Sequence, residues 1–297
     1  MAQEMLREGV RLFPREKPVM RKSLLSLAVL AAFAAPAIAI AQTAAPAPAP
    51  SPVTGNMTIA SDYRFRGISQ TYKGPAIQGG IDYAHDSGLY IGNWNSNVSG
   101  DVYSKGSGIE MDFYGGWKKA FGDFGLDLGF LYYYYPNAEW NVRAGSTNGS
   151  KKFDNQELYV GGSWKWISAK ASYAVSDYFG LNKEQAAGGY WVNQNTNALL
   201  GNRGDSKGTY YLDLTATYPV SDKFSVIGHV GRLKVKHYSD LDYTDWKLGA
   251  TYDLSGWVLG ASFVTTNAKK EWYYTAGSKG NKNTGESTVV LSVAKTF

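Results

Sequence analysis

Twelve segments between residue 54 and the C-terminus alternate apolar and polar residues with a period of two. Near 209–218, for example, Leu212 and Leu214 fall on one face and Asp213 on the other. Successive side chains of a strand point to opposite sides, so each segment predicts a strand with one apolar face. The strands are expected near 56–66, 76–84, 89–98, 108–118, 125–135, 155–164, 168–177, 209–218, 224–232, 244–253, 257–265 and 287–297.

The connections between these strands alternate in length without exception. The five short ones are 85–88, 120–124, 165–167, 219–223 and 253–256. The six long ones lie near 67–75, 99–107, 136–154, 178–208, 233–243 and 266–286. A soluble β-sandwich does not need this sorting, whereas outer-membrane barrels have short periplasmic turns and long extracellular loops. The sequence therefore predicts an all-β, 12-stranded antiparallel transmembrane β-barrel over 54–297, in the bacterial outer membrane.

The composition supports this fold and excludes several kinds of site. The chain has 22 Tyr, 9 Trp, 12 Phe and 34 Gly, and no Cys. A chain without Cys forms no disulfides, no Cys-ligated zinc or iron–sulfur site and no catalytic thiol. The aromatic residues gather at both ends of the expected strands, as in Trp117 and Tyr252 at one end and Tyr63, Phe65 and Trp94 toward the other. This predicts two interfacial girdles; the alternative is an aromatic-rich soluble barrel with a lipocalin-like cavity.

The N-terminus has the pattern of an export signal. Met20-Arg21-Lys22 is followed by an apolar stretch and by Ala39-Ile40-Ala41, a small-x-small cleavage site. We interpret 20–41 as a signal peptide, 42–53 as an Ala/Pro-rich linker and 1–19 as a mis-assigned upstream start. Residues 1–41 hold six Lys/Arg and three Asp/Glu, so the formal net charge falls from +5 to +2 without them. No nucleic-acid partner is expected from so small a charge.

Charged and polar residues on the polar faces of the strands are candidates for the lining of a pore. On the lipid face, Arg or Lys near the midplane would cost up to about 2–4 kcal/mol each, so the alternation assigns these side chains to the lumen. The candidates are Asp62, Arg64, Arg66, Asn93, Asn95, Glu110, Asp112, Tyr133, Glu157, Asp213 and Lys247. Two interpretations remain open: a wet constriction flanked by charges, or a salt-bridged plug. Barrels of about 8 strands are filled and those of about 16–18 hold channels, and twelve lies between.

The last strand ends in an aromatic residue. Leu291 and Val293 alternate with Ser292 and Ala294, and the sequence ends at Phe297. Such an ending is similar to the signal read by the outer-membrane insertion machinery, although Lys295 departs from the usual apolar residue. We therefore predict that Phe297 is an assembly signal. The alternative is an ordinary C-terminal edge strand. Closure of the barrel by this strand is favoured, because an open strand edge in lipid would leave backbone groups unpaired.

Several motifs resemble those of one family. They are SDYRFRGISQ at 61–70, PAIQG at 75–79, GNWNSNV at 92–98, IEMDFYGG at 109–116 and SVAKTF at 292–297. These motifs resemble the TorF-type porins, also catalogued as the Gcw_chp family, over essentially all of 54–297. The resemblance implies a bacterial outer-membrane barrel and a channel. A shared fold does not by itself carry a transport function.

The sequence offers little catalytic chemistry. The three histidines are His85, His229 and His237, and the pair His237 and Ser239 resembles the His-x-Ser arrangement of an outer-membrane lipid deacylase. No metal-ligand spacing and no phosphate-binding loop is present. We therefore expect no enzyme activity, no catalytic residues, no metal and no cofactor.

The function expected from these observations is a porin-like channel for passive diffusion of small polar solutes or ions. The alternatives are a non-conducting structural or surface-interaction barrel and, less favoured, a lipid-modifying outer-membrane enzyme. The expected partners are outer-membrane lipid and lipopolysaccharide, the insertion machinery through the C-terminal strand, and small polar solutes.

Overall fold

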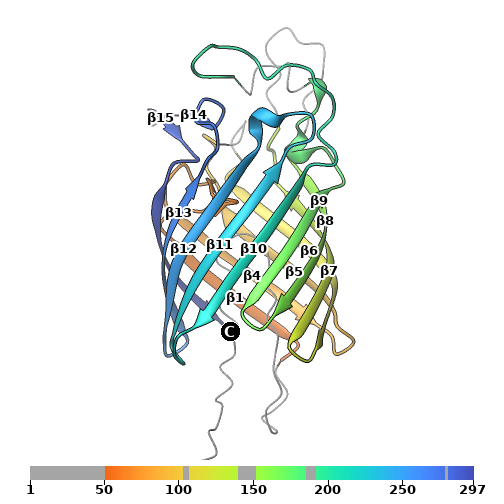
Figure 1. The fold of residues 1–297 in the computed structure, drawn as a ribbon, viewed down its shortest axis with the longest axis vertical. Helices are drawn as coiled ribbons and strands as arrows, with labels where there is room; N and C mark the ends of the chain where they lie inside the picture. The colour runs from red at the N-terminus through yellow and green to blue at the C-terminus, as the bar shows by residue number, and fades with distance from the viewer. Residues whose placement is uncertain (1–50, 103–106, 140–151, 185–191, 278–279) are drawn as a thin grey trace, which may run out of the picture.

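A computed structural model describes residues 51–102, 107–139, 152–184, 192–277 and 280–297. It is a closed barrel of twelve antiparallel strands (Figure 1). The strands are β1 (Val53–Ala60), β4 (Ala76–Ala84), β5 (Leu89–Asn97), β6 (Ile109–Phe121), β7 (Phe124–Tyr134), β8 (Asn155–Trp164), β9 (Ile167–Ala174), β10 (Tyr210–Pro219), β11 (Phe224–Lys234), β12 (Tyr243–Leu254), β13 (Trp257–Thr266) and β16 (Thr288–Thr296). Consecutive strands are neighbours, and β1 closes the ring by pairing with β16. The predicted 12-stranded antiparallel barrel is confirmed.

The remaining elements are short. The hairpin β2 (Arg64–Phe65) and β3 (Ile68–Ser69) follows β1, and the hairpin β14 (Tyr274–Gly277) and β15 (Gly280–Asn283) precedes β16. Two 3₁₀ turns, η2 (Tyr178–Gly180) and η3 (Ser239–Leu241), lie in long connections. None of the helices in the described part of the chain is long and apolar enough to cross a membrane.

The connections sort by length between the two ends of the barrel, as predicted. The short ones lie together at one end, where Figure 1 also marks the C-terminus, and the long ones lie at the other. The turn from β12 to β13 shows how the short ones form: Ser255 and Gly256 both have positive φ, 55° and 85°. Two such residues make the hairpin turn whose twist matches that of the flanking strands. We refer to the two ends as the short-turn end and the long-loop end.

The two faces of the barrel wall differ in polarity. On the outer face large aliphatic side chains are exposed, with Ile81 at 62% and Leu248 at 66%. On the inner face carboxylates are almost fully covered, with Glu110 at 0% and Glu157 at 2%. A soluble protein rarely exposes apolar surface on this scale, so the outer face requires an apolar environment.

The first strand ends earlier than predicted. We expected a strand over 56–66, but β1 ends at Ala60, which pairs with Ala76 on β4. The chain between them turns into the barrel, where Tyr63 and Phe65 are buried. The prediction that Tyr63 and Phe65 join the outer girdle was therefore wrong. Alternation continues past Ala60, and periodicity alone does not distinguish a longer strand from a hairpin that leaves the sheet.

The strand β5 faces the opposite way from the prediction. Directly opposed residues of neighbouring strands share a face, and Asn93 is opposite the exposed Ile81 on β4 and the exposed Phe113 on β6. Asn93 and Asn95 therefore lie on the outer face, and their assignment to the pore lining was wrong. The inner face carries Trp94 instead, whose ring lies 5.5 Å from that of Tyr63, centroid to centroid. An aromatic pair inside the barrel thus overrides the rule that polar side chains face the lumen.

Candidate functional site

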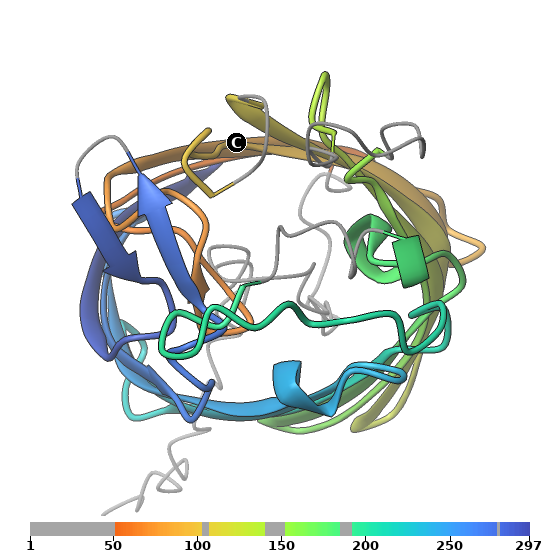
Figure 2. The ribbon, with the colours of Figure 1, turned by 90° about the horizontal axis from the view of Figure 1, so that it is seen from above.

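The most distinctive feature of the lumen is the stretch 61–75, which we call the inward segment. Figure 2 shows it in orange, inside the ring of strands. The segment leaves the sheet after Ser61, whose backbone N–H donates to the Leu291 carbonyl oxygen of β16 over 2.9 Å. The tip turns at Arg66 and Gly67, whose φ angles are 47° and 80°. A Cβ on Gly67 would lie 2.5 Å from Thr266 Cγ2, so glycine allows the tip to reach the wall at β12 and β13.

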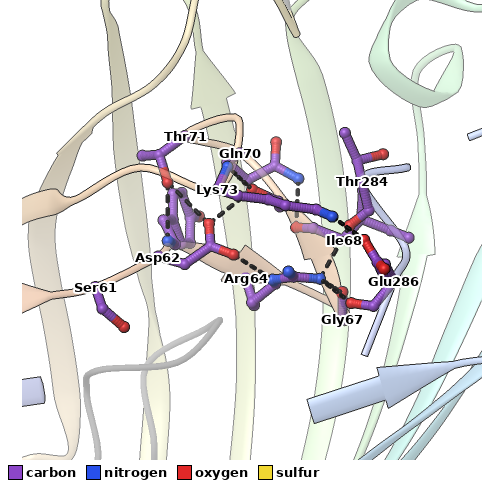
Figure 3. Close-up of polar contacts among 12 residues, drawn as sticks. Ser61, Asp62, Arg64, Gly67, Ile68, Gln70, Thr71, Lys73, Thr284 and Glu286 are labelled. Atoms are coloured by element: carbon purple, nitrogen blue, oxygen red, sulfur yellow. Dashed lines mark hydrogen bonds and ion pairs between the residues drawn. The ribbon is translucent and has the colours of Figure 1, made fainter. Parts of the chain in front are cut away.

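Asp62 ties the two limbs of the inward segment together (Figure 3). Its Oδ2 pairs with Arg64 Nε over 2.5 Å. Its Oδ1 accepts hydrogen bonds from Ser69 Oγ at 2.6 Å and Thr71 Oγ1 at 2.9 Å. A carboxylate that accepts three such bonds is well satisfied although it is buried. The segment is therefore held as a compact hairpin and not as a loose loop.

Arg64 fixes this hairpin to the chain that precedes β16 (Figure 3). Its Nη1 donates to the carbonyl oxygens of Gly67 at 3.1 Å, Thr284 at 3.0 Å and Glu286 at 2.9 Å. Lys73 Nζ adds an ion pair to the Glu286 carboxylate. The hydrogen bond from Lys73 and its positive charge hold the pKa of Glu286 below its usual value. Two cations of the segment thus attach it to the connection between β15 and β16.

Arg66 reaches the opposite wall. Its Nη2 lies 3.0 Å and 2.7 Å from the two carboxylate oxygens of Glu157 on β8, on the far side of the ring from β1. The guanidinium carbon also lies 4.7 Å and 4.4 Å from the ring centroids of Phe65 and Tyr211. Charge pairing and cation–π contact together compensate for burying the guanidinium. The inward segment is therefore bound at both sides of the lumen.

Acidic and aromatic side chains fill the space beside Arg66. Glu110 accepts hydrogen bonds from the hydroxyls of Tyr63 at 2.7 Å and Tyr135 at 2.6 Å. The Tyr133 hydroxyl donates to Glu157 over 3.4 Å, and the buried Asp112 lies on the same strand as Glu110. Among the described residues, Asp112 Oδ1 has no hydrogen-bond partner. The long-loop half of the lumen is thus densely packed around the two arginines.

A second cluster lies on β10, β11 and β12. His229 sits between two carboxylates, with Nδ1 3.2 Å from Asp213 and Nε2 3.0 Å from Asp245. The Tyr211 hydroxyl donates to Asp245 over 2.9 Å, and Lys247 is directly opposite His229 in the register. Sequence reasoning missed His229 because both faces of its strand carry apolar residues. Its partners Asp213 and Asp245 lie on β10 and β12, whose alternation clearly assigns both carboxylates to the lumen. These two carboxylates were the signal that could have placed His229 on the inner face of β11.

Further charges follow one row of paired residues toward the short-turn end. Lys118, Asp127, Gly161, Lys170 and Asp213 are each directly opposite the next, on β6 to β10. All five lie on the inner face. Positive and negative side chains therefore alternate along the row, with Gly161 between Asp127 and Lys170. The prediction omitted Lys118, Asp127 and Lys170 because it considered the long-loop half alone. The same alternation rule assigns them to the lumen.

The predicted pore-lining residues fall into two groups in the structure. The inward segment brings Arg66 to Glu157, whereas Asp62 and Arg64 pair with each other beside the connection before β16. Asp213 and Lys247 lie at the His229 cluster. Asn93 and Asn95 belong to neither group. Both arginines are paired with carboxylates, as the plug interpretation requires. Whether the inward-facing residues line an open pore stays a prediction.

The structure does not assemble a hydrolase site from the residues considered. His237 Nδ1 lies 2.9 Å from the Asp205 carbonyl oxygen, and no contact within the described ranges joins His237 to Ser239. No group of three or more His, Asp or Glu is arranged to hold a metal ion in the same ranges.

The fold and the charged lumen define a porin-like β-barrel. The family model Gcw_chp, described as a bacterial protein of unknown function, matches residues 44–297, and the chain belongs to this family. No curated protein matches the sequence.

Three solved structures are similar at low identity. A KdgM porin is 8% identical, with a TM-score of 0.45, and covers 82% of this chain and 98% of its own. A NanC porin is 9% identical, with a TM-score of 0.44 and the same coverage. OmpF from Salmonella typhi in complex with daunomycin is 8% identical, with a TM-score of 0.38, covering 82% and 97%. Identities and scores this low carry no argument about function.

Proposed function

We propose that this protein is a narrow outer-membrane channel through which small polar solutes or ions diffuse passively. The observation that carries the proposal is the reversal of polarity across a closed wall. The inner face is charged from the long-loop half down to Lys118, and the outer face is aliphatic and aromatic. A closed ring leaves no strand edge unpaired, which a bilayer requires.

The exposed aromatic side chains support the membrane location. Trp164, Tyr218 and Trp257 are exposed near the short-turn end, and Tyr210 and Trp246 toward the long-loop end. Rings at two levels suit the two interfaces of a bilayer. In this arrangement the short turns face the periplasm, and the long loops face outward and meet lipopolysaccharide. An epitope tag at Gly201 should be accessible on intact cells and one at Ser87 should not; surface labelling at Ser87 alone would invert the topology.

The inward segment sets the constriction in this proposal. Arg66 is paired with Glu157, and Glu110 and Asp112 lie on the inner face of β6. The positive charge of the segment therefore stands on one side of an acidic wall, in a lumen of low dielectric constant. Such a transverse field orients polar solutes and biases ions. Large rings such as Tyr133 and Tyr211 narrow the cross-section beside the segment, which would restrict passage to small solutes.

The test is planar-bilayer recording with refolded 42–297. The proposal expects discrete conductance steps and a non-zero reversal potential under a salt gradient. Bilayers that receive the same detergent without protein are the control. Folded, heat-modifiable barrels that insert but never conduct would contradict the channel.

A non-conducting structural barrel is the second candidate, and one observation favours it. Both arginines of the inward segment are buried and paired, and Glu110 and Glu157 beside them are nearly covered. A lumen packed in this way needs no transport role. Silent bilayers together with normal folding would support this candidate. Among the residues that the structure describes, His237 and Ser239 do not form the site that a lipid-modifying enzyme would need, and lipase and deacylase assays would test for this activity.

We also propose that the outer-membrane insertion machinery reads the C-terminal strand. The Phe297 backbone N–H donates to the Gly55 carbonyl over 2.8 Å, and the Gly55 N–H returns a bond of 3.1 Å. The Phe297 side chain is exposed. Deletion of Phe297 should therefore slow insertion and leave aggregates in the periplasm. Unchanged amounts of folded barrel in outer membranes would remove this role.

The N-terminal processing is a further proposal. The signal peptide at 20–41, most of the linker at 42–53 and the upstream residues 1–19 lie outside the described residues. N-terminal sequencing of the mature protein should give Gln42 as the first residue. A mature chain that retains residues before Ala39 would contradict the assigned cleavage site.

A further inference from the structure

Part of the connection between β9 and β10 lies over the long-loop end of the barrel. We call residues 192–206 the strap. Figure 2 shows it as a green to teal trace that runs across the opening of the ring, and Figure 1 shows it above the strands. At one side the Gln194 backbone N–H donates to the Glu271 carbonyl oxygen over 2.9 Å, in the connection between β13 and β14. The strap therefore joins loops that belong to different strand pairs.

The strap is fixed most firmly where it approaches β10. The Tyr238 hydroxyl donates to the Gly204 carbonyl oxygen over 2.5 Å, and His237 Nδ1 lies 2.9 Å from the Asp205 carbonyl oxygen. Gly204 has a φ of 116°, and a Cβ there would stand 2.7 Å from His237 Nδ1. Glycine allows the two loops to approach this closely. These contacts define the attached end of the strap.

The part from 194 to 203 is held by weaker contacts. Among the described residues, two polar contacts join it to other loops: the bond from Gln194 and the ion pair of Arg203 Nη1 with Asp240 Oδ2, at 2.7 Å. The Arg203 side chain is 43% exposed, so solvent and salt screen this pair and it contributes little. Residues 194–199 are exposed. Little polar interaction energy therefore keeps this part in place.

One apolar side chain of this part is buried. Leu200 is 1% exposed and belongs to an apolar cluster that includes Leu241 and Trp272, whereas the adjacent Leu199 is 38% exposed. The next residue, Gly201, has a φ of 80° and open space where a Cβ would lie. Burial of Leu200 favours the position seen in the structure. A segment held by so few buried contacts can open while the rest of the protein stays folded.

We propose that the strap is a lid over the mouth of the lumen, which opens by release of Leu200 and stays attached at Gly204. In the closed position it covers part of the opening. A polar solute that enters from the long-loop end meets this cover before it reaches the constriction of the inward segment. The role of the lid in transport rests on the proposed channel, whereas its opening does not depend on conduction.

The absence of cysteine from the sequence makes the opening measurable. Leu200→Cys and, as the matched control, Leu199→Cys are purified from outer membranes, placed in lipid nanodiscs and treated with a maleimide. Leu199→Cys should react as a free thiol does. Leu200→Cys should react at least about tenfold more slowly, yet to completion while the barrel remains heat-modifiable, because the thiol is reached only in the open state. No reaction of folded Leu200→Cys would overturn the proposal, as would equal rates in the two variants.

A second pair of variants tests the effect of the lid on conduction. Leu200→Ala removes most of the buried side chain and should raise the fraction of time that single channels spend in their highest conductance state several-fold. Leu199→Ala is the control and should leave that fraction unchanged. An unchanged fraction in folded Leu200→Ala, or an equal rise in the control, would overturn the lid. Silent parent barrels together with slow, complete labelling of Leu200→Cys would contradict the channel and still support the opening of the strap.

Discussion

The two halves of the lumen are built from different side chains. In the long-loop half, the inward segment and large rings such as Tyr133 and Tyr211 surround two buried arginines. In the short-turn half, the inner face carries many small residues beside a few larger ones such as Tyr90, and the charges of Lys118 and Lys170 lie at the wall. The small inward-facing residues are Gly125, Ser163, Ser168, Thr217, Gly249, Thr251 and Gly260.

This difference shows that the direction in which a side chain points and the volume that it fills are separate properties, although both belong to the same alternating pattern. Alternation determines which side of the wall a residue faces, but side-chain volume determines how much of the lumen remains. A ring of twelve strands lies between filled and open barrels, so volume decides the outcome. In this protein the inward segment and large rings lie in the long-loop half, and the short-turn half carries more of the small inward-facing side chains. Selectivity by size is therefore expected from the inward segment, and selectivity by charge from both halves.

Removal of the inward segment should have the largest effect. Ala60 and Ala76 are already paired on neighbouring strands, so a short Gly/Ser turn can replace 62–73 without stretching the wall. Single-channel conductance should rise several-fold, because the constriction and its two arginines leave the lumen. The control exchanges the turn at 253–256 for another tight turn, which should leave conductance unchanged. An unaltered conductance after the deletion would show that the segment does not set the resistance.

Breaking the ion pair across the lumen should have the next largest effect. Glu157→Gln leaves the buried Arg66 without its carboxylate, and breaking one partner of such a pair costs about 3–5 kcal/mol of unfolding free energy. Arg66→Met/Glu157→Met removes both charges and should recover most of the loss. Urea unfolding of barrels in lipid measures both. Asp127→Asn in the short-turn half, where Tyr90 donates over 2.6 Å, should cost only about 1 kcal/mol. Equal losses of unfolding free energy from Glu157→Gln and Asp127→Asn would contradict the proposed difference between the two halves.

The strands could be predicted closely because each carries its own signal. The predicted bounds of β4 and β8 agree with the structure, and most others differ by a few residues. The course of the inward segment could not be predicted, since its residues continue the alternation of β1. It leaves the sheet because Asp62 and Arg64 find partners inside the barrel, and those contacts are long-range. The assignment of Asn93 to the lumen was wrong for a related reason. The orientation of β5 depends on the packing of Trp94 against Tyr63, and the alternation of polar and apolar residues gives no information on that contact.

The candidate site was partly predictable on the same grounds. The inward orientation of Glu110, Asp112 and Glu157 follows from the alternation of their strands alone. Their pairing with particular cations depends on the register of several strands and on the tip of a hairpin. The bond between Arg66 and Glu157 joins residues 91 positions apart, on opposite sides of the ring. Local sequence contains no information on such a contact.

Changing a charge in the short-turn half should alter selectivity and leave stability nearly unchanged. Lys170 faces the lumen opposite Asp213 on the next strand, and its Nζ lies 3.9 Å from the Tyr159 ring centroid. Lys170→Gln should move the reversal potential toward cation preference, because one positive charge leaves the wall. The urea midpoint should stay within error of the parent protein. Lys295→Gln on the outer face is the control, and an equal shift there would show that the effect is not luminal.

The smallest effect is expected at low pH, where the inward segment meets the loop before β16. Burial contributes little at Glu286, and the hydrogen bond and charge of Lys73 lower its pKa from the ordinary value of 4.5. The pair therefore stabilises the fold above pH 4.5, and this contribution is lost as the pH falls through the lowered pKa. Since the Glu286 side chain is 57% exposed, the loss should be less than about 1 kcal/mol. Hydrogen exchange at Gly74 should speed up slightly between pH 5 and pH 3, after correction for intrinsic rates. Glu286→Gln should show the faster exchange already at pH 5 and lose the pH dependence; a variant that keeps the parent profile would exclude this ion pair as its source.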